Sequence, residues 1–373
     1  MKAAILHETL VKALGALNRI VSAKGQLPVL ANILIEAEKT GVILSATNLE
    51  IGLRITVGGK VTEEGALTVP ARSLGEFVAS LGTESVGMES AGERLKVTGG
   101  RGVGWFAGIA ASEFPVMPTG KEKTKDGKIV RLKKKTVMEV ATQVAYAAAV
   151  EESRPVLTGI KFYSGDKGFM AVATDGFRLA RKNLEGDTDW SNWGDELILP
   201  SRTIVELAKT LAEGRKEDLG VEMIKENNQV IFTYDTVSVI SRVLEGNFPD
   251  VEKIIPAEYK TKVTADREEL MRAVRSAAIF ARESANVVRL KILDRVMKVA
   301  ATGQQTGEGE MEIEIEKEGD DGEIAFNYRY VLDVLGSFPG ERVLLEMTGG
   351  QTPGVWRPEK DAGLVCLIMP VRV

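Results

Sequence analysis

Apolar side chains recur at intervals of three and four residues in six stretches of the chain. This spacing places them on one face of an amphipathic helix. Between these stretches, apolar and polar residues alternate, as in 41–47 and 229–234, which is typical of half-buried antiparallel strands. The pattern therefore predicts an α+β fold with more sheet than helix. The six predicted helices are 7–24, 72–82, 131–151, 201–217, 264–282 and 327–339.

One motif, a strand, a tight turn and the start of a helix, occurs three times. The copies are 67–74 (LTVPARSL), 197–204 (LILPSRTI) and 324–331 (IAFNYRYV). Pro70, Pro200 and Asn327 hold equivalent places, so the copies are 130 and then 127 residues apart. A repeat of about 125 residues has the size of a domain and can enclose its own core. The sequence thus predicts three tandem copies of one domain.

The predicted domain boundaries follow from the repeat and from two stretches without periodicity. A chain of 373 residues is long enough for two or three domains. The polar run 119–127 and the stretch 249–261 are the predicted junctions. The domains are expected at 1–122, 123–254 and 255–373.

The charge of the chain is unevenly distributed. The net charge is −5, from 48 Lys and Arg residues against 53 Asp and Glu residues. This balance argues against a nucleic-acid partner, because phosphate contacts require a basic surface. Within the six predicted helices, however, the count is +6, which leaves −11 for the rest. If these helices share one side, that side is basic; the alternative is that Lys and Arg simply favour helices.

The reactive side chains argue against catalysis and against a bound metal. His7 and Cys366 are the only residues of their kinds, so the chain cannot build a His or Cys metal cluster, a Ser-His-Asp triad or a Cys-His pair. It contains no G-x-x-x-x-G-K-[ST] phosphate loop. Cys366 lies in an apolar run and is predicted to be a buried strand residue. We therefore expect no metal, no cofactor and no catalytic residue.

Carboxylates are the remaining candidates for acid and base chemistry. Four glutamates alternate with apolar residues, which places them on one face of a strand: Glu310, Glu312, Glu314 and Glu316. A solvated outer face explains that pattern without catalysis. The Asp175-Gly176 pair is a signal for a hairpin turn.

No apolar stretch approaches the roughly 18 residues that span a bilayer. The apolar start of the chain is interrupted at His7 and Glu8. We therefore expect a soluble, cytoplasmic protein with no membrane partner.

Five short segments occur in the order found in a known family. They are 27–30 (LPVL), 154–159 (RPVLTG), 173–180 (ATDGFRLA), 247–250 (NFPD) and 369–373 (MPVRV). Together with the threefold repeat, they make the chain similar along essentially its whole length to the bacterial DNA polymerase III β subunit, the sliding-clamp family. The resemblance implies three tandem DNA-clamp folds and a ring-shaped head-to-tail homodimer, with helices lining the hole and antiparallel sheets outside.

The resemblance implies a non-catalytic processivity factor that encircles duplex DNA and tethers the replicative polymerase. The implied partners are double-stranded DNA, bound topologically and without sequence preference, the DNA polymerase III catalytic subunit, the clamp loader and other proteins with a clamp-binding motif. The implied location is the bacterial cytoplasm, at the nucleoid. A clamp must hold DNA without stopping on it, so it needs diffuse positive charge rather than base-reading side chains.

Six basic residues are candidates for the DNA-facing surface. Four of them match positions at which the family lines its channel, and Lys12 and Arg19 share a predicted helix face with the small residues Gly15 and Ala16. For each residue alone, a solvated surface charge is an equally good interpretation. The candidates are Lys12, Arg19, Lys24, Arg72, Arg154 and Arg202.

The resemblance also implies a subunit interface. By family position, Phe106 in the first domain of one copy would meet Ile279 and Phe280 in the third domain of the other, beside paired edge strands. Ordinary core packing is the alternative interpretation of these three residues.

The family has a pocket between its second and third domains that takes short linear peptides. Apolar walls with Met and Pro suit hydrophobic anchors, while Arg178 and Arg372 could bind peptide carbonyls or carboxylates. Phe177 replaces a His that is common in relatives, and Lys253 a common Arg, so we expect an altered peptide preference. The matching positions are Leu157, Thr174, Gly176, Phe177, Arg178, Leu179, Pro249, Lys253, Ile254, Leu367, Ile368, Met369, Pro370, Val371 and Arg372.

Two other functions fit parts of the sequence. A triplicated peptide-binding scaffold that never encircles DNA would be a monomer with no preference for closed circular DNA. A carboxylate-dependent hydrolase with its site in a cleft between domains would lose turnover when an acid is changed to its amide.

Overall fold

The structure, a computed structural model, describes residues 1–22, 27–118, 129–151, 153–165, 168–184, 196–212, 214–224 and 227–372. The chain divides into two compact units. Unit 1 is Met1–Lys134 with Glu206–Val243, and unit 2 is Lys135–Val205 with Leu244–Val373. The division passes through the second repeat. The predicted junction 119–127 lies outside the described residues.

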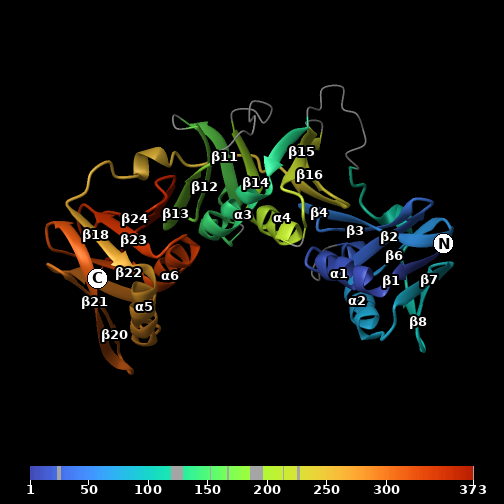
Figure 1. Cartoon of the computed structure of the whole chain (residues 1–373), viewed down its shortest axis with the longest axis horizontal. Coiled ribbons are helices and arrows are strands. Elements are labelled where there is room, and N and C mark those ends of the chain that lie inside the picture. Colours follow the sequence, from blue (N-terminus) through green and yellow to red (C-terminus); the bar gives the residue numbers. More distant parts are fainter. Residues whose placement is uncertain are drawn as a thin grey trace. The chain divides into compact units, whose positions relative to one another are not determined.

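The described residues contain six α-helices, two in each third of the chain, as the apolar spacing predicts (Figure 1). Each is shorter than predicted, and α3 differs most, because it ends at Gln143 and Ala145–Ala147 form a separate 3₁₀ turn. Asp266 and Asn327 cap the first turns of α5 and α6 by accepting from backbone N–H groups. The helices are α1 (His7–Asn18), α2 (Ala71–Ser80), α3 (Lys134–Gln143), α4 (Ser201–Ala212), α5 (Arg267–Ala281) and α6 (Tyr328–Ser337).

The shorter helices carry less charge than predicted. Within the observed bounds, ten Lys and Arg residues stand against seven Asp and Glu residues, a net +3 in place of +6. Because the net charge of the whole chain is −5, the residues outside the helices carry a net charge of −8. The net charge of the helices is positive, as predicted. It is smaller than predicted because basic residues such as Arg19 and Arg131 lie just outside the observed helices.

Unit 1 contains two antiparallel sheets. Their strand orders are β5-β1-β7-β8-β9 and β10-β15-β16-β17-β4-β3-β2-β6. Helices α1 and α2 pack against each other and bury apolar faces that include Leu14 and Leu74. The strands are β1 (Lys2–Leu6), β2 (Asn32–Glu38), β3 (Gly41–Thr47), β4 (Ile51–Val57), β5 (Gly59–Glu63), β6 (Gly65–Pro70), β7 (Ser85–Ala91), β8 (Arg94–Gly99), β9 (Gly102–Ala107), β10 (Val130–Lys133), β15 (Asp218–Ile224), β16 (Gln229–Tyr234) and β17 (Val237–Arg242).

One antiparallel sheet of twelve strands runs through unit 2. Its order is β14-β11-β12-β13-β25-β24-β23-β18-β21-β20-β19-β22. Helices α5 and α6 contact each other beside it. The strands are β11 (Gly159–Gly165), β12 (Gly168–Thr174), β13 (Arg178–Asn183), β14 (Glu196–Pro200), β18 (Thr261–Asp266), β19 (Val287–Ile292), β20 (Val296–Gly303), β21 (Gly307–Gly319), β22 (Gly322–Asn327), β23 (Arg342–Met347), β24 (Gly354–Pro358) and β25 (Leu364–Ile368).

An apolar cluster on one face of this sheet joins the second repeat to the third. Leu179 of β13 lies opposite Leu367 of β25, which in turn lies opposite Val355 of β24. Phe248 and Val251, from the segment that follows β17, are buried in the same cluster. Burial of apolar side chains is the main favourable term in folding, so this cluster fastens the two repeats together.

Cys366 is buried in β25, as predicted. Burial raises the pKa of its thiol to about 12, and the Tyr146 hydroxyl donates to its sulfur at 3.1 Å. In the described ranges, no group of three His, Cys, Asp or Glu residues is placed to hold a metal ion. No helix in these ranges is long and apolar enough to cross a membrane.

Candidate DNA-facing surface, peptide pocket and subunit edges

The predicted DNA-facing residues on α1 and α2 are exposed cations with acidic neighbours. Lys12 Nζ lies 2.9 Å from Glu8 Oε1, and Arg72 Nε lies 3.5 Å from Glu76 Oε1. The Arg72 side chain is 87% exposed. Exposed pairs one helical turn apart contribute only about 0.3–0.5 kcal/mol. Such pairs can exchange readily for contacts with phosphate.

Three other candidates lie elsewhere in the chain. Arg154 is exposed just before the 3₁₀ turn Pro155–Thr158, and Arg202 is exposed in the first turn of α4. Lys24 lies outside the described residues.

Arg19 differs from the other candidates, because a buried carboxylate holds it. It follows the last residue of α1, and its Nε donates to Glu206 Oε2 on α4 at 2.8 Å. Glu206 is 7% exposed and also accepts from Lys209 Nζ at 2.8 Å. Burial alone would raise the pKa of Glu206, but the hydrogen bonds from Lys209 and Arg19 outweigh it and lower the pKa. The ionised Glu206 thus ties the end of α1 to α4.

The predicted pocket residues from the second and third repeats meet on one face of the unit 2 sheet. Leu157, Leu179 and Leu367 are buried in the apolar cluster described above, and we call these three residues the pocket floor. Ile368 is also buried. As the next residue on β25 after Leu367, it points to the opposite face of the sheet.

Two exposed apolar side chains lie two residues from the floor residues Leu179 and Leu367, and a third lies three residues after Val251 of the same cluster; we call these three side chains the pocket rim. Phe177 is 63% exposed, Ile254 is 45% exposed and Met369 is 41% exposed. The N–H of Met369 donates to the carbonyl of Phe177 at 2.8 Å, so these two residues are adjacent. Exposed apolar side chains beside an apolar floor suit a hydrophobic peptide.

A tight turn between β12 and β13 presents Phe177, as the Asp175-Gly176 pair predicts. Gly176 has a φ of +90°, which residues with a side chain rarely adopt. Asp175 Oδ1 accepts from the backbone N–H groups of Phe177 and Arg178, each at 2.9 Å. The Thr174 hydroxyl donates to the Arg178 carbonyl at 2.6 Å and accepts from the Gly176 N–H at 3.1 Å. Thr174 and Gly176 therefore shape the loop.

Arg178 is held by groups of its own chain. Its Nε lies 3.0 Å from Asp175 Oδ2, and its Nη1 pairs with Asp333 of α6. The guanidinium stacks 4.7 Å from the centre of the Tyr330 ring and 5.5 Å from that of Tyr146. Its side chain is only 11% exposed. Arg178 thus links the second repeat to the third, whereas the sequence led us to expect contact with a peptide.

The C-terminal pocket candidates lie along the edge of the sheet. The N–H of Val371 donates to the carbonyl of Ala325 in β22, the last strand of the sheet, at 2.8 Å. Pro370 is partly exposed and Arg372 is exposed. Val371 and Arg372 help to line a hollow of about 310 Å³ that also contains Glu323.

The remaining pocket candidates, Pro249 and Lys253, are exposed on the segment after β17. Lys253 Nζ lies 2.8 Å from Asp250 Oδ2. This pairing raises the pKa of Lys253, so its charge is retained.

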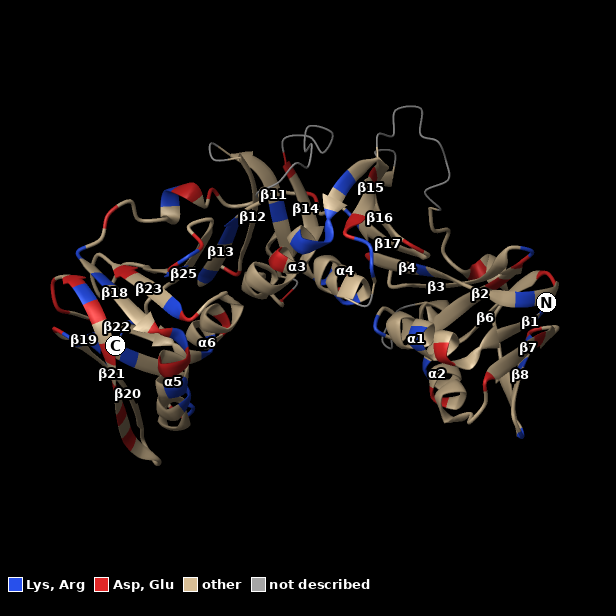
Figure 2. Ribbon diagram, viewed as in Figure 1, with Lys and Arg blue, Asp and Glu red and all other residues tan. Residues whose placement is uncertain are grey.

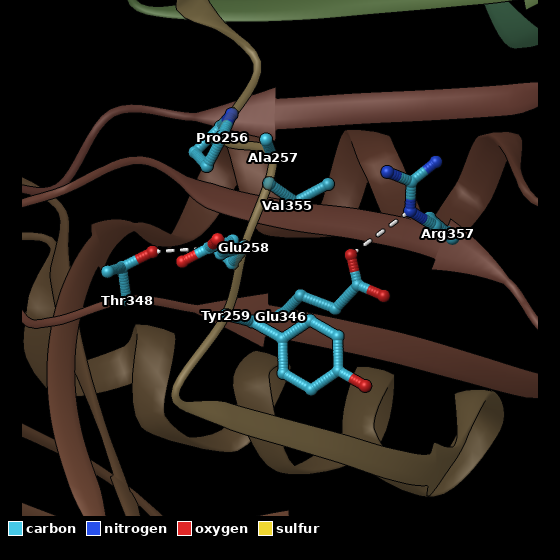
Figure 3. A pocket seen from close by; sticks show the side chains of 8 residues that line it. All are labelled: Pro256, Ala257, Glu258, Tyr259, Glu346, Thr348, Val355 and Arg357. Carbon is cyan, nitrogen blue, oxygen red and sulfur yellow. Dashed lines mark hydrogen bonds and ion pairs between the residues drawn. The ribbon is translucent and has the colours of Figure 1, made fainter.

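A second hollow, of about 230 Å³, lies on β23 and β24 (Figure 3). Val355 lines it and also belongs to the apolar cluster of the pocket floor. Arg357 Nε donates to Glu346 Oε2 at 3.1 Å, and the Thr348 hydroxyl donates to the carbonyl of Glu258 at 3.0 Å (Figure 3). No motif in the sequence indicated this hollow, because its walls come from a connecting segment and two strands.

Phe106 lies on β9, which ends the five-stranded sheet of unit 1. Its ring packs edge-on against Phe77 of α2, with the ring centres 5.6 Å apart. Phe106 is partly exposed.

Ile279 and Phe280 lie on α5 beside β21. Ile279 is 57% exposed. The Phe280 ring covers Gly309 so closely that a Cβ at Gly309 would lie 2.3 Å from it. Met311, two residues further along β21, is 43% exposed. The face of β21 that packs against α5 is therefore apolar, and at Met311 part of it is exposed to solvent.

The edges that carry these residues hold equivalent places in the repeats. Strand β4 of the first repeat pairs with β17, the last strand of the second. Strand β13 of the second repeat pairs in the same way with β25, the last strand of the third. In the third repeat, the strand equivalent to β4 and β13 is β21. In the first repeat, the strand equivalent to β17 and β25 is β9. In the described chain, β21 pairs with β20 as far as Glu314, and its other side meets β18 only from Ile315 onward.

Charged residues of opposite sign lie at β9 and β21: basic residues of the neighbouring strand β8 stand beside β9, and glutamates lie on β21 itself. Trp105 of β9 is 50% exposed, and the charged groups of Arg94 and Lys96 each lie 5.5 Å from the centre of its ring. On β21, all four glutamates predicted to share one strand face are exposed, which confirms that prediction. Figure 2 marks acidic residues along this strand in red. Lys298 of β20 bridges Glu310 and Glu312 at 2.7 and 2.8 Å.

The chain matches three known family models, one for each repeat. The DNA polymerase III beta subunit N-terminal domain matches residues 1–118, its central domain 131–250 and its C-terminal domain 252–372. The chain belongs to the DNA polymerase III beta subunit family. This family is the sliding clamp, a non-catalytic processivity subunit of the polymerase, as the sequence resemblance implied.

Relatives of the beta subunit family extend over the full chain. The beta sliding clamp of Staphylococcus aureus is 28% identical over 384 residues, which cover 100% of this chain and 99% of the relative. The crystal structure of the DNA polymerase sliding clamp from Bacillus subtilis matches with a TM-score of 0.90 and 25% identity, over 100% of this chain and 99% of that one. The DNA polymerase III subunit beta from Pseudomonas aeruginosa matches with a TM-score of 0.88 and 27% identity, over 100% of both chains. The predicted fold of three tandem clamp domains is confirmed.

Proposed function

We propose that the protein is a DNA sliding clamp, which closes around duplex DNA as a ring of two copies and tethers the replicative polymerase. Membership of the beta subunit family and similarity to proteins named beta sliding clamp support this function. The repeated strand pairing is the observation that carries the ring. Two junctions between repeats have the same form, and β9 and β21 are the strands that remain for a third.

Pairing of β9 in one copy with β21 in another gives this third junction, which we call the seam. The seam joins two different surfaces, and each copy has one of each, so two copies close into a head-to-tail ring. Phe106 then faces Ile279 and Phe280 of the other copy. Arg94 and Lys96 face the acidic side of β21, and opposite charges favour the correct encounter.

The DNA-facing surface consists of Lys12, Arg19, Lys24, Arg72, Arg154 and Arg202. Lys12 and Arg72 support this role, because each forms only a weak, exposed ion pair with a carboxylate, and DNA phosphate can replace that carboxylate. Contacts of this kind provide attraction without sequence preference and allow sliding. The closed ring, rather than any single contact, retains the DNA.

The pocket floor and rim take the apolar side chains of short peptides. These peptides belong to the DNA polymerase III catalytic subunit, the clamp loader and other proteins with a clamp-binding motif. Each copy contributes three clamp domains, with boundaries near residues 122 and 254. The protein works in the bacterial cytoplasm, at the nucleoid.

The solution mass, measured by light scattering at micromolar concentration, tests the ring. We expect a mass near twice 40.4 kDa. The protein is then loaded onto nicked circular DNA, and the DNA is linearised. Protein that stays on circles and leaves cut DNA is bound topologically. A monomer, or equal retention on both forms of DNA, would favour a peptide-binding scaffold instead.

A further inference from the structure

The segment that joins the second repeat to the third crosses the face of the unit 2 sheet that carries the pocket floor. We call residues 244–260 the linker. Backbone hydrogen bonds fasten both of its ends: the Leu244 N–H donates to Ile198 at 2.8 Å, and the Lys260 N–H donates to Met347 at 3.0 Å. The stretch between these ends contributes Ile254 to the pocket rim. Its position therefore depends on what holds the middle of the linker.

Glu252 makes polar contacts that join this middle stretch to the sheet. Its Oε1 accepts from the Tyr163 hydroxyl at 2.7 Å, and its Oε2 pairs with Arg181. Tyr163 lies on β11 and Arg181 on β13, so these two contacts join the middle of the linker to two strands of the sheet. Burial alone would raise the pKa of Glu252, but the hydrogen bonds from Tyr163 and Arg181 outweigh it and lower the pKa. The carboxylate is thus ionised at neutral pH.

The partners of Glu252 are themselves fixed in the sheet. Arg181 on β13 has a side chain that is only 12% exposed. Tyr163 on β11 packs against the apolar cluster of the pocket floor. Neither partner has to be ordered when the contact forms, so both provide a rigid anchor for the linker.

Glu252 begins a short 3₁₀ turn, Glu252–Ile254, that has a buried residue before it and an exposed residue at its end. Val251 is 4% exposed and lies in the apolar cluster with the pocket floor. The Ile254 N–H donates to the Val251 carbonyl at 3.2 Å. Ile255, directly after the turn, packs against the same cluster. The two contacts of Glu252 add polar restraints between these apolar anchors and fix the orientation of the turn.

We propose that Glu252 is a positioning residue of the peptide pocket, which holds the linker turn against Tyr163 and Arg181 so that Ile254 stays at the rim. This inference rests on the peptide site of the proposed function. It adds that the affinity for an apolar peptide depends on a carboxylate that the peptide need not touch. A rim residue that is already ordered loses less conformational freedom when the peptide binds.

A fluorescent peptide, selected on the wild-type protein from a random hexapeptide library, is the probe. Its dissociation constant is measured by fluorescence anisotropy, with thermal unfolding in parallel. We expect Glu252→Gln and Glu252→Ala to raise the dissociation constant about threefold to tenfold, since a half-exposed ion pair is of modest strength. Glu258→Gln is the matched control, because it makes the same charge change at an exposed position of the same linker. It should leave the affinity unchanged.

Charge reversal separates positioning from a general loss of structure. Arg181→Glu and Glu252→Arg should each weaken peptide binding, and the double variant should return to within about twofold of the wild type. Unchanged affinity in both Glu252 variants, or a loss that the double reversal does not recover, would overturn the proposal. A wild-type protein that selects no peptide would instead refute the peptide site, and this inference with it.

Discussion

The exposed isoleucine on α5 provides a quantitative test of the ring. Ile279 is 57% exposed in the single chain, and this fraction becomes buried only if a second copy covers it. Ile279→Ala removes three carbons, whose full burial is worth about 2.4 kcal/mol at ~0.8 kcal/mol each. Scaled by the exposed fraction, the loss is about 1.4 kcal/mol per seam and about 2.7 kcal/mol for a ring with two seams. The dissociation constant of the dimer should therefore rise about 100-fold.

Sedimentation equilibrium over a range of concentrations measures this change. Thermal unfolding of the single chain should change little, because more than half of the side chain is already in water. Val150→Ala, at a 92% exposed position in the second repeat, is the control and should leave the dimer unchanged. A dissociation constant for Ile279→Ala within about twofold of the wild type would refute the placement of Ile279 at the seam.

Other predictions address the remaining sites. Arg72→Glu combined with Arg202→Glu should shorten the sliding lifetime on circular DNA and reduce its salt dependence without changing thermal unfolding; unchanged lifetimes would remove both residues from the DNA-facing surface. Deletion of 369–373 should abolish peptide binding while the dimer persists, because it removes part of the rim, and retained affinity would contradict this. Cys366 should resist a thiol reagent at about pH 8 until denaturant is added, because burial raises the pKa of its thiol to about 12; rapid labelling of the native protein would contradict the packing. Glu206 has a lowered pKa in the folded protein, so it stabilises the fold above its unfolded pKa and loses this effect as the pH falls through its folded pKa. The stability difference between wild type and Glu206→Gln should shrink over that acidic range, and a constant difference would argue against the ionised pair with Arg19.

The six helices and the turn before Phe177 could be predicted, because each is set by neighbouring residues. Apolar spacing over a few turns is enough for a helix, and Asp175 needs only the next three residues for its hydrogen bonds. The end of α3 could not be predicted. The apolar spacing continues through Val144 and Ala148, and both are buried, but the chain beyond Gln143 leaves the helix. Val144 and Ala148 could be buried either in a longer helix or in the 3₁₀ turn that follows α3, and tertiary packing selects the turn.

The candidate sites depended more heavily on family resemblance. The leucines of the pocket floor lie on separate segments, so no local pattern shows that they meet. The ion pairs were missed for the same reason. Arg178 and Asp333 are 155 residues apart, and Arg19 and Glu206 are 187 residues apart. Charged residues at such separations give no sign of each other in the sequence, so the folded chain was needed to show that Arg178 and Arg19 have internal partners.

The two junctions within the chain differ from the proposed seam in one respect. At the β4–β17 and β13–β25 junctions, the polypeptide itself connects the paired strands, whereas β9 and β21 would meet across separate chains. A ring of two copies has two such seams, so when one parts, the other still holds the copies together. Reclosure is then intramolecular, at an effective concentration on the order of millimolar. The rate at which DNA enters or leaves the ring can therefore be far higher than the rate at which the dimer separates, and the two rates require separate measurements.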